Sequence, residues 1–192
     1  MFGFFKITPR PNYNLFNTEI DKYRHLINWI KISLDKHMLV YHFDNTQNEA
    51  EQLLKAAQLE YSKDINSGSK VLLIDAESLL KGSWPLDYWV IVLEIYPVTN
   101  REQTLMQRAK EHSHSLEFYA AIDSPFFKLF GGEQHAAFIQ KNNADKDEAM
   151  SHPLINRAIV KSQKKVEDKL QLEVTERESI EQWIQVNGID RE

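Results

Sequence analysis

Cysteine is absent from this chain of 192 residues. Its absence excludes disulfide bonds, a thiolate nucleophile and cysteine-ligated metal sites. Glycine and proline are scarce, at six residues each, and no tandem repeat or low-complexity segment is present. The composition is that of an ordinary globular protein, with 42% hydrophobic and 27% charged residues.

Long apolar runs are also missing. No stretch approaches the ~20 residues that a membrane-spanning helix requires. The amino-terminal MFGFFKITPRP lacks the basic start and the apolar core of a secretory signal. We therefore expect a cytoplasmic protein without a transmembrane segment. The net charge of -5 disfavours nonspecific nucleic-acid binding, so no nucleic-acid partner is expected.

Four short apolar runs predict buried strands. They alternate with helix-like segments, which is typical of a mostly parallel sheet joined by right-handed crossovers. The predicted fold class is therefore α/β, with helices on both faces of the sheet. The runs are Met38–Phe43, Lys70–Asp75, Tyr88–Ile95 and Leu116–Ile122.

Helix starts are indicated by capping residues. Thr18 precedes an acidic first turn, and Ser151-His152-Pro153 places a proline in the first turn of a long basic helix. Two capping-box patterns, Thr46 to Glu49 and Thr175 to Glu178, predict two further helices, the last of which ends at Asn187-Gly188.

These signals divide the chain into three parts. Pro9 and Pro11 favour an extended amino-terminal segment over residues 1–17. Residues 18–168 carry the strand and helix pattern. Residues 169–192 form a divergent helical carboxyl-terminal extension.

Two motifs in the second half of the chain carry a family resemblance. The first is FGGE, residues Phe130–Glu133, and the second is DKDEAMSHPLINRAIVKSQKKVED, residues Asp145–Asp168. Together they resemble the end of the second nucleotide-binding domain of SecA, the motor ATPase of bacterial protein export, and the start of its scaffold helix. The ordered matches are His152, Arg157, Ala158, Ile159 and the run from Gln163 to Glu167.

The resemblance covers about Pro9 to Asp168. It implies a RecA-like domain of the P-loop NTPase superfamily, of the helicase carboxyl-terminal type. In such a motor, ATP lies between two RecA-like domains. The G-x-x-x-x-G-K-[ST] loop of the first domain is absent from this sequence.

The arginine-rich motif of the second domain is also degraded. The family pattern E-R-H-E-S-R-R-I-D-N-Q-L-R-G-R-A-G-R is similar to the segment Glu94–Ser113 here, in which Arg108 is retained. The final arginine becomes Glu111, whose carboxylate would repel a phosphate. The glycine-rich A-T-N-M-A-G-R-G-T-D becomes IDAESLLKGS at Ile74–Ser83. We therefore expect a pseudo-ATPase that is not an enzyme and binds no cofactor.

Six basic residues are candidate site residues. Arg101 and Arg108 are candidate remnants of nucleotide contacts. A basic face on the long helix, which would bind a partner, comprises Arg157, Lys161, Lys164 and Lys165.

Histidines and tryptophans favour simpler interpretations. His112 and His114 lack the further ligands of a metal site, so we assign no metal. We interpret the four tryptophans, Trp29, Trp84, Trp89 and Trp183, as packing residues rather than a recognition cage.

The leading hypothesis is a catalytically inactive SecA-like module that binds protein, with SecA or another Sec component as the candidate partner. One alternative is that the chain supplies half of an ATP site in trans to a partner ATPase, through Arg101 and Arg108. A second alternative is a nucleic-acid-binding domain of the helicase kind.

Overall fold

The computed structural model describes residues 11–129 and 149–189. Five parallel strands form one sheet in the order β1-β5-β4-β2-β3. The strands are β1 (Tyr13–Phe16), β2 (Lys36–Tyr41), β3 (Val71–Asp75), β4 (Tyr88–Val92) and β5 (Leu116–Ala121). The parallel α/β fold predicted from the sequence is confirmed.

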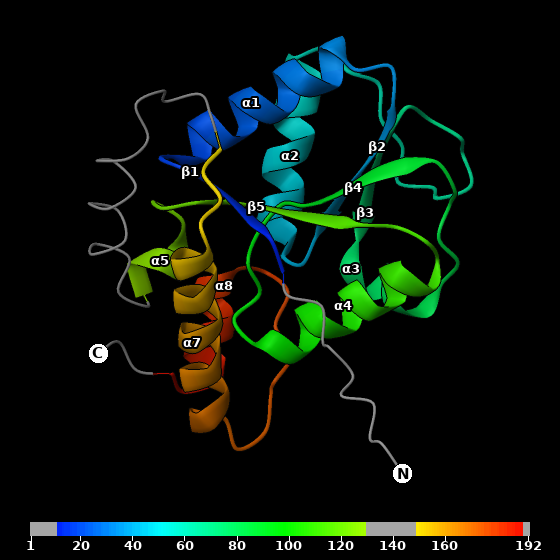
Figure 1. The fold of residues 1–192 in the computed structure, drawn as a ribbon. Coiled ribbons are helices and arrows are strands. Elements are labelled where there is room, and N and C mark those ends of the chain that lie inside the picture. Colours follow the sequence, from blue (N-terminus) through cyan, green and yellow to red (C-terminus); the bar gives the residue numbers. More distant parts are fainter. Residues whose placement is uncertain (1–10, 130–148, 190–192) are drawn as a thin grey trace.

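Helices cover both faces of the sheet (Figure 1). One face packs against α1 (Glu19–Ile32) and α2 (Asp44–Ala56). The other packs against a larger group of helices. That group contains α3 (Ala76–Lys81), α4 (Thr99–Glu111), α5 (Pro125–Leu129), α7 (Pro153–Lys169) and α8 (Ile180–Val186).

Alternation along the strands explains the two layers. In β2, Met38 and Val40 face the larger helix group, whereas Leu39 and Tyr41 face α1 and α2. Successive strand residues point to opposite faces, so an unbroken apolar run indicates a strand that is covered on both sides.

The edge strand β1 was not predicted as a strand. Its residues lie in the segment predicted to be extended, and they pair in parallel with β5. Tyr13, Leu15 and Phe16 are fully buried. Pro11 lies just before β1, where a missing N–H disrupts no sheet hydrogen bond.

Two predicted helix starts are corrected. Helix α2 begins at Asp44, so Thr46 lies inside the helix and its hydroxyl donates to Glu94 instead of capping. Helix α8 begins at Ile180, and its N-cap is Ser179, whose side chain accepts from Gln182 N. The other starts are confirmed, at Thr18 for α1 and at His152-Pro153 for α7.

Helix α8 belongs to the main hydrophobic core. Ile180, Trp183 and Ile184 join the cluster beneath the sheet, and Trp183 is fully buried. The helix ends where Gly188 adopts a φ of +64°, as the Asn-Gly stop signal predicted. The FGGE motif lies outside the described residues.

Candidate functional site at the carboxyl edge of the sheet

A crevice is expected where the carboxyl ends of β2 and β4 meet. The chain leaves β2 through α2 toward β3, and it leaves β4 through α4 toward β5 on the opposite side. In parallel α/β sheets, ligands bind at such a switch point. The residues after the two strands, 42–46 and 93–96, therefore form the candidate site.

The carboxylate of Glu94 occupies this crevice. It accepts hydrogen bonds from the backbone N–H groups of His42 (2.6 Å) and Phe43 (3.1 Å). It also accepts one from the hydroxyl of Thr46 (2.5 Å). The amino terminus of a helix attracts anions, and here the protein's own carboxylate lies at the start of α2. Desolvation raises the pKa of Glu94 to about 7, and these hydrogen bonds act in the opposite direction.

The next donors of α2 are satisfied by the connection between α7 and α8, residues 170–179, which we call the strap. Asp44 N donates to the carbonyl of Arg177 (2.6 Å), and Asn45 N donates to that of Glu178 (3.0 Å). The Arg177 guanidinium donates to Asp75 at the end of β3 (2.7 Å). The strap therefore closes the crevice from outside.

Helix α4 is capped in the same manner from α7. One carboxylate oxygen of Glu167 accepts from Thr99 N (2.6 Å), from the Thr99 hydroxyl (2.6 Å) and from Asn100 N (3.1 Å). The first amides of both helices at this edge thus bind acceptors of the same chain.

Lys22 lies beneath the crevice and is 2% exposed. Its ammonium group donates to the carbonyl of Leu93 (2.9 Å) and forms an ion pair with Glu19. A cavity of about 180 Å³ beside it is also lined by Thr46 and Glu94. Because Lys22 is already paired with a carboxylate, this cavity offers little net positive charge to an anion.

Arg101 reaches the same edge from α4, where three partners hold it. It forms ion pairs with Glu77 and Glu173 and donates to the hydroxyl of Thr175 (3.3 Å). Its guanidinium also lies over the Tyr96 ring, 5.1 Å from the centroid. Arg101 therefore tethers the strap to α3 and α4.

Arg108 lies about two helical turns further along α4, roughly 10 Å away by helical rise. It pairs with Glu111 (3.0 Å) and donates to the carbonyl of Gly82 (3.2 Å). The structure does not bring the two predicted nucleotide contacts together. The Ile74–Ser83 segment contains the end of β3 and helix α3, with Asp75 as the N-cap of α3.

The predicted basic face is brought together on α7. Arg157, Lys161, Lys164 and Lys165 are all exposed. Their spacing places them on the same side of the helix. Asp168 lies one turn beyond them and is also exposed.

The four tryptophans divide into two pairs. Trp84 and Trp183 are core residues, as predicted. Trp29 and Trp89 line a groove, and 42% of Trp89 is exposed. The rings of His112 and His114 lie 6.0 and 5.6 Å from the Trp84 ring.

Sequence reasoning missed Glu94 and Lys22 as site residues. A signal existed for Glu94, because an acid two residues after an apolar strand lies at the ligand-binding edge of a parallel sheet. The strap gave no such signal, because its contacts with Asp44 and Asp75 join residues far apart in the chain.

The geometry defines a parallel α/β domain in which the helix amides at the carboxyl edge of the sheet bind the chain's own side chains and strap. The described part of the chain contains no helix long and apolar enough to cross a membrane. Comparison with known proteins adds a partial similarity, and no protein-family model matches the chain.

The similarity is to segments of SecA. The chain is 34% identical over 55 residues to protein translocase subunit SecA 1 of Alkaliphilus metalliredigens. It is 38% identical over 53 residues to SecA of Dechloromonas aromatica and 37% identical over 51 residues to SecA of Wolbachia pipientis. These matches cover 27 to 29% of this chain and 6% of each relative. They are therefore partial and distant.

Among solved structures, the chain is similar to the carboxyl-terminal part of the Fun30 ATPase domain, with a TM-score of 0.45 and 12% sequence identity. The likeness covers 78% of this chain and 54% of that one.

Proposed function

We propose that this chain is a catalytically silent relative of the second motor domain of SecA and acts as a protein-binding module. The observation that carries the proposal is the internal occupation of the ligand edge. Glu94 and the strap satisfy the amino-terminal donors of α2, and Glu167 satisfies those of α4. A triphosphate would have to displace these acceptors to reach the same amides.

The cations near the crevice support the same conclusion. Lys22, Arg101 and Arg177 each pair with at least one carboxylate. Catalysis of phosphoryl transfer requires positive groups aimed at the developing charge. Cations that are already neutralised by the protein supply little of that stabilisation.

Calorimetric titration with Mg-ATP and Mg-ADP tests the catalytic half of the proposal. We expect no saturable heat at millimolar nucleotide and no phosphate release above background. Binding in the micromolar range, or steady phosphate release by the purified chain, would overturn this half. Arg108→Ala would then show whether Arg108 contacts the nucleotide.

The binding half rests on the SecA similarity and on the basic face of α7. The expected partner is SecA or another component of the translocation machinery, bound by contacts that weaken as salt rises. Surface-immobilised chain would be titrated with SecA in about 50 and 200 mM salt.

A charge-reversed variant makes that test specific. The double variant Lys161→Glu/Lys164→Glu should weaken SecA binding about tenfold or more. Lys110→Glu, an exposed change on α4, should leave it unchanged. Equal SecA binding by both variants would exclude the α7 face as the binding surface. If the unmodified chain binds neither SecA nor another Sec component, the proposed link to translocation is wrong.

A further inference from the structure

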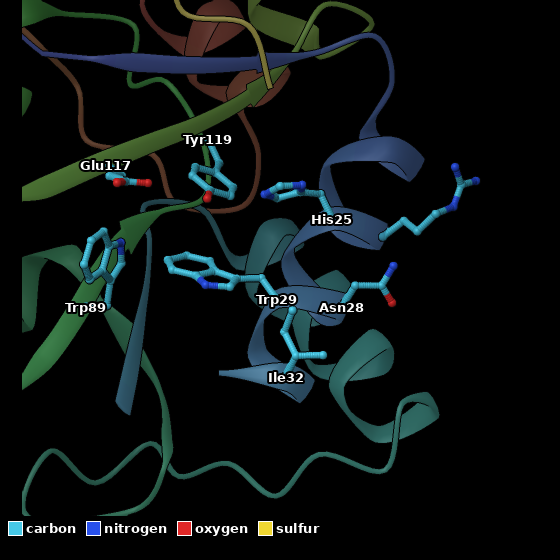
Figure 2. A pocket seen from close by; sticks show the side chains of 8 residues that line it. His25, Asn28, Trp29, Ile32, Trp89, Glu117 and Tyr119 are labelled. Carbon is cyan, nitrogen blue, oxygen red and sulfur yellow. The ribbon is translucent and has the colours of Figure 1, made fainter. Parts of the chain in front are cut away.

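A second hollow lies on the α1 side of the sheet, at the amino ends of β4 and β5 and thus at the edge opposite the crevice. Its volume is about 400 Å³, within the range of small-ligand pockets. Its lining includes Asn28, Trp29, Ile32, Trp89, Glu117 and Tyr119, and we call it the aromatic groove. Figure 2 shows the Trp29 indole pointing from α1 toward Trp89 and Tyr119, with Glu117 beside Tyr119.

Three aromatic rings meet here at fixed angles. Trp29 and Trp89 are nearly perpendicular, at 88° with centroids 5.5 Å apart. Trp29 and Tyr119 are closer to parallel, at 21° and 6.5 Å. The buried His37 packs against Trp29 from the sheet, at 4.9 Å and 83°. Trp29 is therefore held in place beside Trp89, which is 42% exposed, and aromatic rings attract cations.

Glu117 adds a negative charge to the aromatic groove. Its carboxylate accepts from the side-chain amide of Asn14 (3.3 Å) and interacts with the Tyr119 hydroxyl. Among the described residues, no cation forms an ion pair with it. Arg24 and His25 also line the groove, and Arg24 pairs with Asp21 (3.1 Å). A carboxylate beside aromatic faces is complementary to a cationic group, and the net charge of -5 also favours basic ligands.

An apolar shelf adjoins the charged part of the groove. Ile32 is 81% exposed and Trp89 is 42% exposed. The Asn28 side chain is available on the same wall to hydrogen-bond a peptide group. These features fit a ligand in which a cationic side chain is adjacent to an apolar one and to backbone amides.

We propose that the aromatic groove binds a peptide segment through an arginine or lysine side chain, with the cation over Trp29 and Trp89 and near Glu117. Ile32 contacts an apolar neighbour of that residue. This site goes beyond the proposed function, because it uses a surface separate from both the crevice and the basic face of α7.

Indole N–H resonances of the ¹⁵N-labelled chain report on the groove directly. The probe is the capped peptide Gly-Ala-Arg-Leu-Ala-Gly, and its control carries citrulline, which has the shape of arginine without the charge. We expect saturable shifts of the Trp29 and Trp89 signals, with Trp84 and Trp183 unmoved. The citrulline peptide should bind about tenfold more weakly or worse.

Variants locate the site. Glu117→Gln and Trp89→Ala should each weaken binding about fivefold or more. Glu60→Gln, an exposed carboxylate outside the groove, should bind like the unmodified chain. Circular dichroism of each variant confirms folding before titration.

Several results would overturn the proposal. These are an equal affinity for the citrulline peptide, dominant shifts at Trp84 or Trp183, or no saturation by about 10 mM peptide. If arginine amide alone binds as tightly as the peptide, the groove recognises a single cationic group and not a peptide segment. The assay contains neither nucleotide nor SecA, so its outcome is independent of the proposed function.

Discussion

Glu102 is the most completely buried carboxylate at the carboxyl edge of the sheet, with 1% of the residue exposed. It accepts from the Tyr13 hydroxyl and from Tyr96 N (3.0 Å), and Gln163 donates to the Tyr96 carbonyl (2.8 Å). The network joins β1, α4 and α7 and has no cation as a member. Burial raises the pKa of Glu102 to about 7, so the folded protein holds a proton there that the unfolded chain releases near pH 4.3.

The sign of the resulting pH dependence follows from that difference. Because the folded state binds more protons between about pH 4.5 and 7, the free energy of unfolding falls as pH rises through this window. Glu102→Gln mimics the protonated acid. The variant should match the unmodified chain near pH 4.5 and exceed its stability by roughly 1–3 kcal/mol at pH 8.

Urea unfolding at several pH values measures this effect. Glu94, whose pKa is also raised, contributes to both curves, so their difference isolates Glu102. Glu60→Gln controls for loss of an exposed charge. Parallel curves for the unmodified chain and Glu102→Gln would contradict the assignment.

We expect Arg101 to stabilise the fold and Arg108 to contribute little to stability. Arg101 joins Glu77, Glu173 and Thr175, whereas Arg108 pairs with the exposed Glu111. Arg101→Ala should lower the free energy of unfolding by about 1–3 kcal/mol because it leaves partly buried acceptors unpaired. Arg108→Ala should have a clearly smaller effect. Chemical denaturation of the two variants tests this order, and a reversed order would disprove the role of Arg101 as a tether.

At the scale of elements, α7 stabilises the start of α4 through one residue. Glu167→Gln removes the charge that binds two backbone amides and a hydroxyl of α4. The variant should lose about 1–2 kcal/mol. Asp168→Asn, the exposed neighbour on the same helix, should change little. Thermal unfolding compares the stability of the two variants. Equal losses of stability would show that any negative charge on α7 has this effect and that the cap of α4 does not cause it.

Regular elements could be predicted from the sequence where an apolar pattern was long enough. The runs at Lys70–Asp75 and Leu116–Ile122 match β3 and β5 closely. The four-residue β1 was too short to be distinguished from an extended segment. Capping patterns misled at Thr46 and Thr175, because the helices begin two residues before Thr46 and five residues after Thr175.

The resemblance to SecA predicted the site only as a set of departures from that family's pattern. These departures, such as the acid at Glu111, are local and visible in the sequence. The groups that fill the crevice are not, because Glu94 binds His42 and the strap binds Asp44 and Asn45 only once the chain has folded. Likewise, the aromatic groove depends on β4 and β5 lying next to each other in the sheet, a strand order that the order of elements in the sequence does not specify.

At the scale of the molecule, the sheet is shared by two hydrophobic clusters. One contains residues of α1 and α2, and the other contains residues of α4, α7 and α8. Since α8 contributes to the second cluster, the chain after Lys169 has no separate core among the described residues. The sequence predicts that residues 169–192 are a separate extension. The alternative is that the strap and α8 unfold together with the rest of the domain as one cooperative unit.

Trp183 distinguishes these two possibilities. It is fully buried, its indole N–H donates to Glu173 (3.3 Å), and its ring contacts that of Tyr96. Trp183→Ala should lower the free energy of unfolding by about 3–5 kcal/mol. If the chain is one unit, far-ultraviolet and near-ultraviolet circular dichroism should still report a single coincident transition. The control Val186→Ala, on the same helix and 43% exposed, should have little effect. An early transition confined to α8, with the sheet as stable as before, would instead show that residues 169–192 are an independent extension and that the strap closes the crevice without support from the core.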